Sequence, residues 1–155
     1  MQTEGLDRIV RAHPFFAGLD ERFLALVGGC ARNVRFETGQ YLFQEGEPAD
    51  TLFLLRFGQV ALQVAAPGRR TLTFQTAREG DIVGLSALIP PYRAPYDARA
   101  QTLVRAIAMD GGCLRGKCEA DHHLGYEVMK RLVPVLAARL HATRQQALDL
   151  YGSPS

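Results

Sequence analysis

The segment that decides the fold is 37-ETGQYLFQEGEPAD-50, in which a short apolar run lies between two glycines. Gly39 and Gly46 flank Tyr41-Leu42-Phe43, and aromatic residues of this kind favour β-strands. Glycine has no Cβ and is favoured where a tight turn needs a positive φ. The segment therefore predicts a turn, a strand and a second turn.

The same pattern continues on both sides of this segment, where short apolar or alternating runs are separated by turn residues. The runs lie at 34–36, 41–43, 52–55, 60–64, 72–74, 82–83 and 104–109. The run 52–55 is continuously apolar, which indicates a strand buried on both faces. Strands this short, with turns between them, are typical of a sandwich or barrel rather than of βαβ units. We predict a mainly β fold with flanking helices, in which residues 31–109 form a β jelly-roll.

Helical patterns flank the predicted strands. Residues 1–30 have apolar residues at helical spacing, and Pro14 interrupts them because the residue before a proline leaves the α region. Asp110 and Asp121 can each cap a helix N-terminus, so residues 110–155 are expected to form a short helix and then a long one. At 155 residues the three segments are expected to make one domain.

The long helix carries a stripe of apolar residues spaced by four and three in turn. The stripe comprises Met129, Val133, Leu136, Leu140, Thr143, Ala147 and Leu150. This heptad pattern buries against another helix, and we predict that it forms a homodimer. The alternative is packing on the N-terminal helices of the same chain. A second stripe of Val128, Leu132 and Val135 is expected to face the barrel, and Pro134 is expected to kink the helix.

Composition excludes several classes of function. The 18 basic and 16 acidic residues give a net charge of +2, too little to indicate a nucleic-acid or membrane-surface binder. The sequence has no apolar run of membrane-spanning length and no leader pattern, so a cytoplasmic location is expected. The four histidines fall in the predicted helical ends, whereas a jelly-roll metalloenzyme needs them on strands. Neither an enzyme nor a metal site is expected.

The three cysteines form an odd set without a disulfide framework, which is typical of a reducing compartment. We expect Cys30 to be a small core residue and Cys113 and Cys118 to be inert thiols. Arg115 and Lys117 leave a redox role open, because basic neighbours lower the pKa of a thiol.

Three motifs together resemble the cyclic nucleotide-binding domain. The segment 37–50 resembles its opening strand–turn–strand unit, and 52-LFLLRFGQV-60 resembles its next hairpin. The segment 80-GDIVGLSAL-88 resembles the entry to its phosphate-binding cassette, which would occupy residues 80–100. The resemblance extends over about residues 10 to 151 and includes the sensor half of Crp/Fnr-type regulators. It implies a regulatory domain that senses a small ligand.

The resemblance also implies which side chains should contact a cyclic nucleotide. In the family a glutamate directly after the cassette glycine accepts the ribose hydroxyl, and a later arginine pairs with the phosphate. Here Leu85 occupies the glutamate position, and the arginine position falls on Ala94 or Pro95, with Arg93 beside it. A leucine cannot accept a hydrogen bond, so binding of cyclic AMP or cyclic GMP is not the leading expectation.

Three interpretations stay open: a cyclic nucleotide, another small anionic ligand, or a protein-interaction and dimerisation scaffold with a vestigial pocket. Ser86 is expected to donate to an anion or to cap the short helix. Arg99 is expected to reach the ligand or to pair with Asp97 or Asp81. The full set of predicted ligand-binding residues is Gly84, Leu85, Ser86, Ala87, Arg93 and Arg99.

Crp/Fnr-type regulators follow the long helix with a winged helix-turn-helix, whereas this sequence reaches residue 155 soon after the predicted helix. The resemblance therefore implies a stand-alone sensor domain, for which a protein partner is possible and direct DNA binding is not expected. Arg131, Arg139 and Arg144 are interpreted as a solvated helix face.

Overall fold

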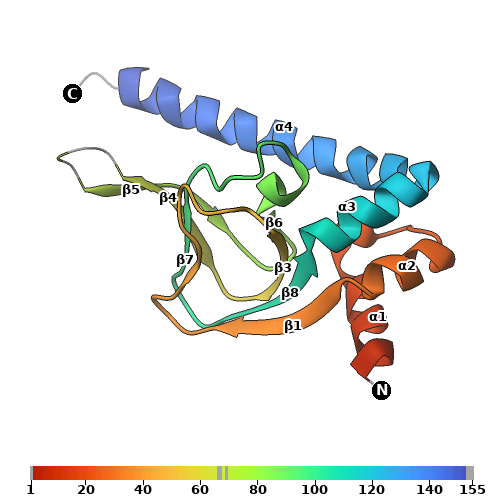
Figure 1. Ribbon diagram of the computed structural model, residues 1–155. Coiled ribbons are helices and arrows are strands. Elements are labelled where there is room, and N and C mark those ends of the chain that lie inside the picture. Colours follow the sequence, from red (N-terminus) through yellow and green to blue (C-terminus); the bar gives the residue numbers. More distant parts are fainter. Residues whose placement is uncertain (1, 66–67, 69, 153–155) are drawn as a thin grey trace.

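The computed structural model describes residues 2–65, 68 and 70–152, and it consists of helical ends around a two-sheet core (Figure 1). In chain order the elements are α1 (Gln2–Ala12), the 3-10 turn η1 (Pro14–Phe16), α2 (Glu21–Gly28), β1 (Ala31–Phe36), β2 (Tyr41–Phe43), β3 (Thr51–Phe57), β4 (Val60–Ala65), β5 (Thr71–Ala77), β6 (Ile82–Val83), the 3-10 turn η2 (Leu85–Leu88), β7 (Asp97–Ala100), β8 (Val104–Asp110), α3 (Gly111–Ala120) and α4 (His122–Gly152).

The strands form two four-stranded sheets, with the orders β1-β8-β3-β6 and β2-β7-β4-β5. Every strand pair is antiparallel. Strands that are far apart in sequence pair with each other, as in β1 with β8 and β2 with β7. This arrangement confirms the predicted jelly-roll with flanking helices.

Two apolar cores meet at β3. Phe53 and Leu55 face the other sheet and belong to the barrel core. Leu52 and Leu54 face outward and belong to a second core, which the helices form over the β1-β8-β3-β6 sheet. Successive side chains of a strand point to opposite faces, so one continuously apolar run supplies both cores. The prediction of a strand buried on both faces is confirmed.

The helices cover one side of the sheets, with α1, α2 and α3 gathered together and α4 extending lengthwise (Figure 1). Asp110 caps α3, since its carboxylate accepts a hydrogen bond from the Cys113 backbone N–H at 2.7 Å. Asp121 precedes α4 and accepts from the N–H groups of His123 and Leu124 at 3.0 and 3.2 Å. Both predicted helix starts are therefore found at the residues that the capping argument named.

The two apolar stripes of α4 have opposite environments. Val128 and Leu132 are buried in the helical core, and Val135 packs against it, so this stripe faces inward as expected but contacts the helical core rather than the barrel core. The other stripe is exposed: Met129 by 43%, Val133 by 60%, Leu136 by 38% and Leu140 by 59%. Thr143 and Ala147 are exposed as well, whereas the side chain of Leu150 lies outside the described part. The stripe is thus not covered by the chain's own N-terminal helices.

Helix α4 continues through Pro134 as a single helix. No described helix combines the length and the hydropathy that a membrane span requires.

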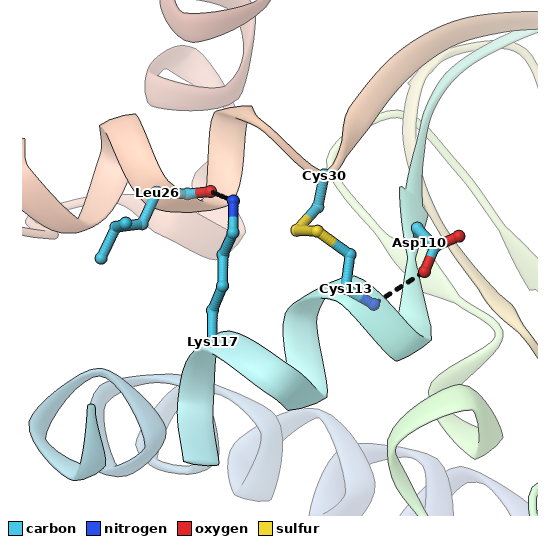
Figure 2. Close-up of a disulfide and its surroundings, with 5 residues drawn as sticks. All are labelled: Leu26, Cys30, Asp110, Cys113 and Lys117. Atoms are coloured by element: carbon cyan, nitrogen blue, oxygen red, sulfur yellow. Dashed lines mark hydrogen bonds between the residues drawn. A yellow bond between two sulfur atoms is a disulfide. The ribbon is translucent and has the colours of Figure 1, made fainter. Parts of the chain in front are cut away.

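The expectation of three unpaired cysteines is wrong, because Cys30 and Cys113 form a disulfide (Figure 2). Their Cα atoms are 5.7 Å apart although 83 positions separate them in the sequence. The cause is the pairing of β1 with β8, which sets Ala31 opposite Met109 and brings the preceding Cys30 next to the first turn of α3. Cys118 is a free, half-buried thiol.

Candidate functional site

A cavity of about 380 Å³ opens between the sheets, beside η2. It extends from the barrel core, of which Phe53 is part, to exposed residues at its rim such as Glu47 and Asp50. Its lining comprises Arg32, Val34, Phe36, Leu42, Phe43, Glu47, Pro48, Ala49, Asp50, Thr51, Phe53, Gly84, Ser86, Ala94, Pro95 and Tyr96. Residues from five separate parts of the chain thus converge on one hollow.

Gly84 shapes the side of the cavity formed by η2. Its φ is +88°, and a Cβ there would lie 2.6 Å from the carbonyl oxygen of Thr51. Only glycine fits both the left-handed conformation and this close approach. The turn that follows places Ser86 in the cavity lining, while Leu85 is directed into the helical core.

Aromatic rings make up much of the wall. Phe53 lies between Phe36, with ring centroids 5.6 Å apart, and Phe43, at 6.4 Å. Tyr96, which directly precedes β7 in the same sheet as Phe43, lies 6.0 Å from the Phe43 ring. Rings at these distances pack favourably with each other and present apolar faces and edges to an occupant. This wall suits an apolar ring better than a fully hydrated ion.

The polar groups of the lining are few and sit mainly at the rim. Ser86 supplies a hydroxyl beside η2, and Thr51 donates its own hydroxyl to Asp50 at 3.0 Å. The charged lining groups are one cation, Arg32, and two carboxylates, Glu47 and Asp50, all on exposed residues. The cavity therefore has no concentration of positive charge.

The structure separates the predicted ligand-binding residues. Gly84 and Ser86 line the cavity, whereas Leu85 and Ala87 are buried in the helical core. Ser86 is not the cap of η2, because Gly84 occupies the cap position. The remaining two predicted residues, Arg93 and Arg99, lie outside the cavity lining.

Arg93 and Arg99 both donate hydrogen bonds to backbone carbonyls. Arg93 donates to Gly46 at 3.0 Å, and Arg99 donates to Gly39 at 3.0 Å. The Arg99 guanidinium also stacks over the Tyr41 ring, 5.2 Å from its centroid. Neither side chain belongs to the cavity lining.

The carboxylates expected as the alternative partners of Arg99 serve the backbone instead. Asp97 accepts from the N–H of Glu45 at 2.7 Å, and Asp81 accepts from the N–H of Arg78 at 2.8 Å. The predicted pairing of Arg99 with Asp97 or Asp81 is therefore wrong.

Two arginines of α4 are not on a solvated face, contrary to expectation. Arg139 is half-buried and donates hydrogen bonds to the carbonyl of Ile82 and to the Tyr96 hydroxyl, the latter at 3.3 Å. Arg131 donates to the Ala17 carbonyl at 2.9 Å and to Glu127 at 2.7 Å. The apolar stem of an arginine can pack along an apolar surface, and here the charged ends are held by hydrogen bonds to the chain.

The ion pair of Arg131 changes the acidity of its partner. The hydrogen bond from Arg131 is the main cause that holds the pKa of Glu127 below its ordinary value. Arg131 and Arg139 thus hold α4 to the end of η1 and to β6.

Sequence reasoning missed most of the cavity wall. Val34, Phe36 and Phe43 were identified as strand residues, and their inward side follows from alternation. Which part of the inner face is filled and which is hollow depends on the shapes of both sheets. The two-residue alternation along a single strand carries no information about this.

Comparison with known proteins identifies the family. The family model described as "Cyclic nucleotide-binding domain" matches residues 33–121. A CRP-like cAMP-activated global transcriptional regulator of Mycobacterium tuberculosis is 30% identical over 145 residues, which are 94% of this chain and 63% of the regulator. The chain thus spans less than two thirds of the length of that relative.

Solved structures agree with this assignment. A protein of Geobacter metallireducens GS-15, provisionally named a cyclic nucleotide-binding protein, is 32% identical with a TM-score of 0.78, covering 87% of this chain and 98% of that one. A cyclic nucleotide-binding domain of Methylobacillus flagellatus KT shares the fold at 20% identity, with a TM-score of 0.78 over 95% of this chain and 83% of that one. This chain belongs to the cyclic nucleotide-binding domain family.

Proposed function

We propose that this chain is a regulatory domain that binds a small aromatic ligand with one anionic or polar group in the cavity between its sheets. The observation that carries the proposal is the cavity itself, about 380 Å³ in volume and walled by Phe36, Phe43, Phe53 and Tyr96. Its volume falls within the range of about 300 to 1,000 Å³ typical of small-molecule sites. The hydroxyl of Ser86, within η2, is the polar group available to the ligand on that side of the cavity.

A cyclic nucleotide suits this cavity less well. Ala94 and Pro95 line the wall where the family resemblance places the phosphate-binding arginine. Arg93 is the nearest cation in sequence, but its guanidinium is engaged with the Gly46 carbonyl. Leu85 is 4% exposed and has no hydrogen-bonding group for a ribose hydroxyl. An unpaired phosphate charge in an aromatic wall is unfavourable.

The proposed output is a change in α4. Tyr96 lines the cavity and receives a hydrogen bond from Arg139 of α4. The residue after Arg139 is Leu140, which belongs to the exposed stripe. A ligand that displaces the Tyr96 ring therefore shifts the stripe, by which we propose that two copies of the chain pair.

Ligand screening by calorimetry and thermal unfolding tests the proposal. The probes are indole-3-acetate, its neutral counterpart indole, benzoate, cyclic AMP and cyclic GMP. We expect an aromatic carboxylate, whose charged group can stay at the exposed rim with Arg32, to stabilise the chain by about 2.7 kcal/mol at one hundred times its dissociation constant, and cyclic AMP to have no effect. The variant Ala94→Phe fills the cavity and should abolish the response, while Ala65→Phe, at an exposed site, should retain it.

The outcomes separate the alternatives. Stabilisation by cyclic AMP that Ala94→Phe removes would replace the proposed ligand class with a cyclic nucleotide. No response to any probe would favour the dimerisation scaffold, whose supporting observation is the exposed stripe of α4.

A further inference from the structure

The disulfide joins two chain segments that the backbone already holds together (Figure 2). Cys30 immediately precedes β1, and its carbonyl accepts a hydrogen bond from the Asp110 N–H at 2.9 Å. The β1–β8 ladder begins at the next pair, Ala31 with Met109. The two sulfur atoms are therefore kept close by backbone pairing, so that breaking their bond leaves the thiols positioned to form it again.

On one side the disulfide reaches the end of α2. Cys30 follows the last turn of that helix, where its N–H donates to the Val27 carbonyl at 3.0 Å. Val27 is fully buried in the helical core. Lys117, one turn after Cys113, donates a hydrogen bond to the Leu26 carbonyl, which links α3 to α2 beside the disulfide (Figure 2). The disulfide is the only covalent link between these two helices in the described chain.

On the other side of the disulfide, α3 contacts η2 and a residue at the rim of the cavity. The Gly111 N–H donates to the carbonyl of Asp50, a rim residue, at 2.8 Å. A Cβ at Gly111 would lie 2.9 Å from the Cβ of Ala87, so the first turn of α3 sits directly on η2. Arg115 donates to the Ala87 carbonyl at 2.6 Å, and its guanidinium lies 4.1 Å from the Tyr92 ring centroid. Movement of α3 is thus transmitted to residues 84–92.

We propose that Cys30 and Cys113 form a reversible thiol–disulfide site whose redox state sets the position of α3 against η2 and so the ligand affinity of the cavity. The effect on ligand affinity rests on the proposed function, whereas the redox site does not. The chemical class of the reactant is a dithiol for reduction and a disulfide for oxidation.

The exchange begins at Cys113, which is half-buried, whereas Cys30 is only 7% exposed. A thiolate of the dithiol attacks the Cys113 Sγ, and Cys30 leaves with the electron pair of the S–S bond and takes up a proton. The second thiolate of the reactant then attacks the reactant sulfur that is bonded to Cys113 in the mixed disulfide. The bond to Cys113 breaks, and Cys113 leaves as a thiolate that takes up a proton. Two electrons and two protons pass to the protein, and the dithiol becomes a disulfide.

Cys118 does not compete for this exchange. It lies five positions beyond Cys113 on α3, about 140° around the helix, and therefore points elsewhere. Burial, helped by the nearby Glu119 and Asp121 carboxylates, raises the pKa of the Cys118 thiol. A protonated thiol is a poor nucleophile, so Cys118 remains a spectator.

The redox site is tested on the full chain by equilibration in buffers of reduced and oxidised dithiothreitol, followed by alkylation and mass spectrometry. We expect one alkylated cysteine, Cys118, in the oxidised chain, and three after reduction under native conditions. Cys118→Ser should keep this two-electron transition, whereas Cys30→Ser and Cys113→Ser should each abolish it. Three reactive thiols in oxidising buffer, or a bond that is reduced only after unfolding, would overturn the proposal.

The coupling to the cavity is tested without a ligand, by amide hydrogen exchange of the oxidised and reduced chain. We expect reduction to accelerate exchange in α3 and in residues 84–92, and to leave β4 and β5 unchanged. Reduced wild-type protein serves here, so the test does not depend on whether the cysteine variants fold. Equal acceleration everywhere, or none in residues 84–92, would refute the coupling.

Affinity is then compared with 1-anilinonaphthalene-8-sulfonate as the fluorescent aromatic anion. We expect the dissociation constant of this probe to differ at least about fivefold between the two redox states. We also expect the Ala94→Phe variant to lose this redox-dependent binding. Equal dissociation constants with unequal exchange in residues 84–92 would overturn the effect on affinity and leave the redox site standing. Absent cavity binding in both states would instead count against the proposed function.

Discussion

Arg139 of α4 donates a hydrogen bond to the Tyr96 hydroxyl, at 3.3 Å, and the ring of that tyrosine lines the cavity between the sheets. The same guanidinium donates to the carbonyl of Ile82 in β6. One side chain of the long helix therefore contacts both the cavity wall and the strand that leads into η2. Two side chains, Tyr96 and Arg139, therefore connect the cavity with α4.

Removing the Tyr96 hydroxyl should weaken this link without emptying the cavity. We expect Tyr96→Phe to lower the free energy of unfolding by about 1 kcal/mol, the net value of one hydrogen bond. The matched control is Tyr126→Phe, because Tyr126 is 61% exposed and should change little. In a double-mutant cycle with Arg139→Met, urea unfolding should give a coupling of at least about 0.5 kcal/mol. Additive effects would mean that the two side chains are energetically independent.

Charge in the middle of the exposed stripe should prevent pairing of two chains. We expect Leu136→Glu to sediment as a monomer in analytical ultracentrifugation, because a buried carboxylate without a partner opposes association. Leu148 is 57% exposed and lies outside the heptad stripe, so Leu148→Glu is the matched control and should remain dimeric. A Leu136→Glu dimer would show that the stripe is not the interface.

Gly84 should tolerate no side chain. Gly84→Ala forces a φ of +88° on alanine and sets its Cβ 2.6 Å from the Thr51 carbonyl oxygen. Gly46 has a similar φ of +87° with no heavy atom within 4 Å of a Cβ, so Gly46→Ala isolates the conformational cost of about 1 to 2 kcal/mol. We expect urea unfolding to show a larger loss for Gly84→Ala. Equal losses would mean that the close approach to β3 relaxes freely.

His13 should make stability depend on pH. Its imidazole is 5% exposed, is 3.2 Å from the Leu55 carbonyl through Nε2, and accepts from the Phe15 N–H through Nδ1. Burial is the main cause that lowers the pKa of His13 from its ordinary 6.5, so the folded chain favours the neutral ring. In the pH range between the lowered value and 6.5 the unfolded chain binds more protons, and its population therefore rises as the pH falls.

The expected result is a loss of stability as the pH drops below 6.5, at up to about 1.4 kcal/mol per pH unit, with a plateau below the lowered pKa. Unfolding by urea between pH 8 and pH 4 measures it. His13→Gln should remove this part of the pH dependence, whereas His122→Gln, at an exposed position, should retain it. Identical pH profiles for His13→Gln and the unmodified chain would rule out His13 as the cause.

Much of the fold follows from local patterns. The continuous run 52–55 predicted a strand with two buried faces, and Asp110 and Asp121 predicted where two helices begin, because these signals depend on neighbouring residues alone. The disulfide depends on the register between the first and the last strand, β1 and β8, which cysteine spacing does not contain. The inward orientation of the Arg131 and Arg139 side chains could not be predicted either, because a helical pattern places the Cβ of a long side chain and not its charged end.

The candidate site was predictable only in part. The cassette motif located Gly84 and Ser86, which line the cavity, since both stand in one turn with a characteristic glycine. Arg93 and Arg99 were assigned by their charge, and the backbone carbonyls of Gly46 and Gly39 hold them instead. A sequence does not show which backbone carbonyl will accept a hydrogen bond from an arginine. The competition between such a carbonyl and a ligand for the arginine is therefore visible only in the structure.

Strand β3 supplies alternate residues to the barrel and to the helical layer, and this has a consequence for unfolding. Leu52 and Leu54 cannot leave the helical core while Phe53 and Leu55 remain in the barrel core, because all four share one short backbone segment. We therefore expect the helices and the sheets to unfold as a single cooperative unit. A destabilising change in either layer lowers one common transition temperature rather than producing two.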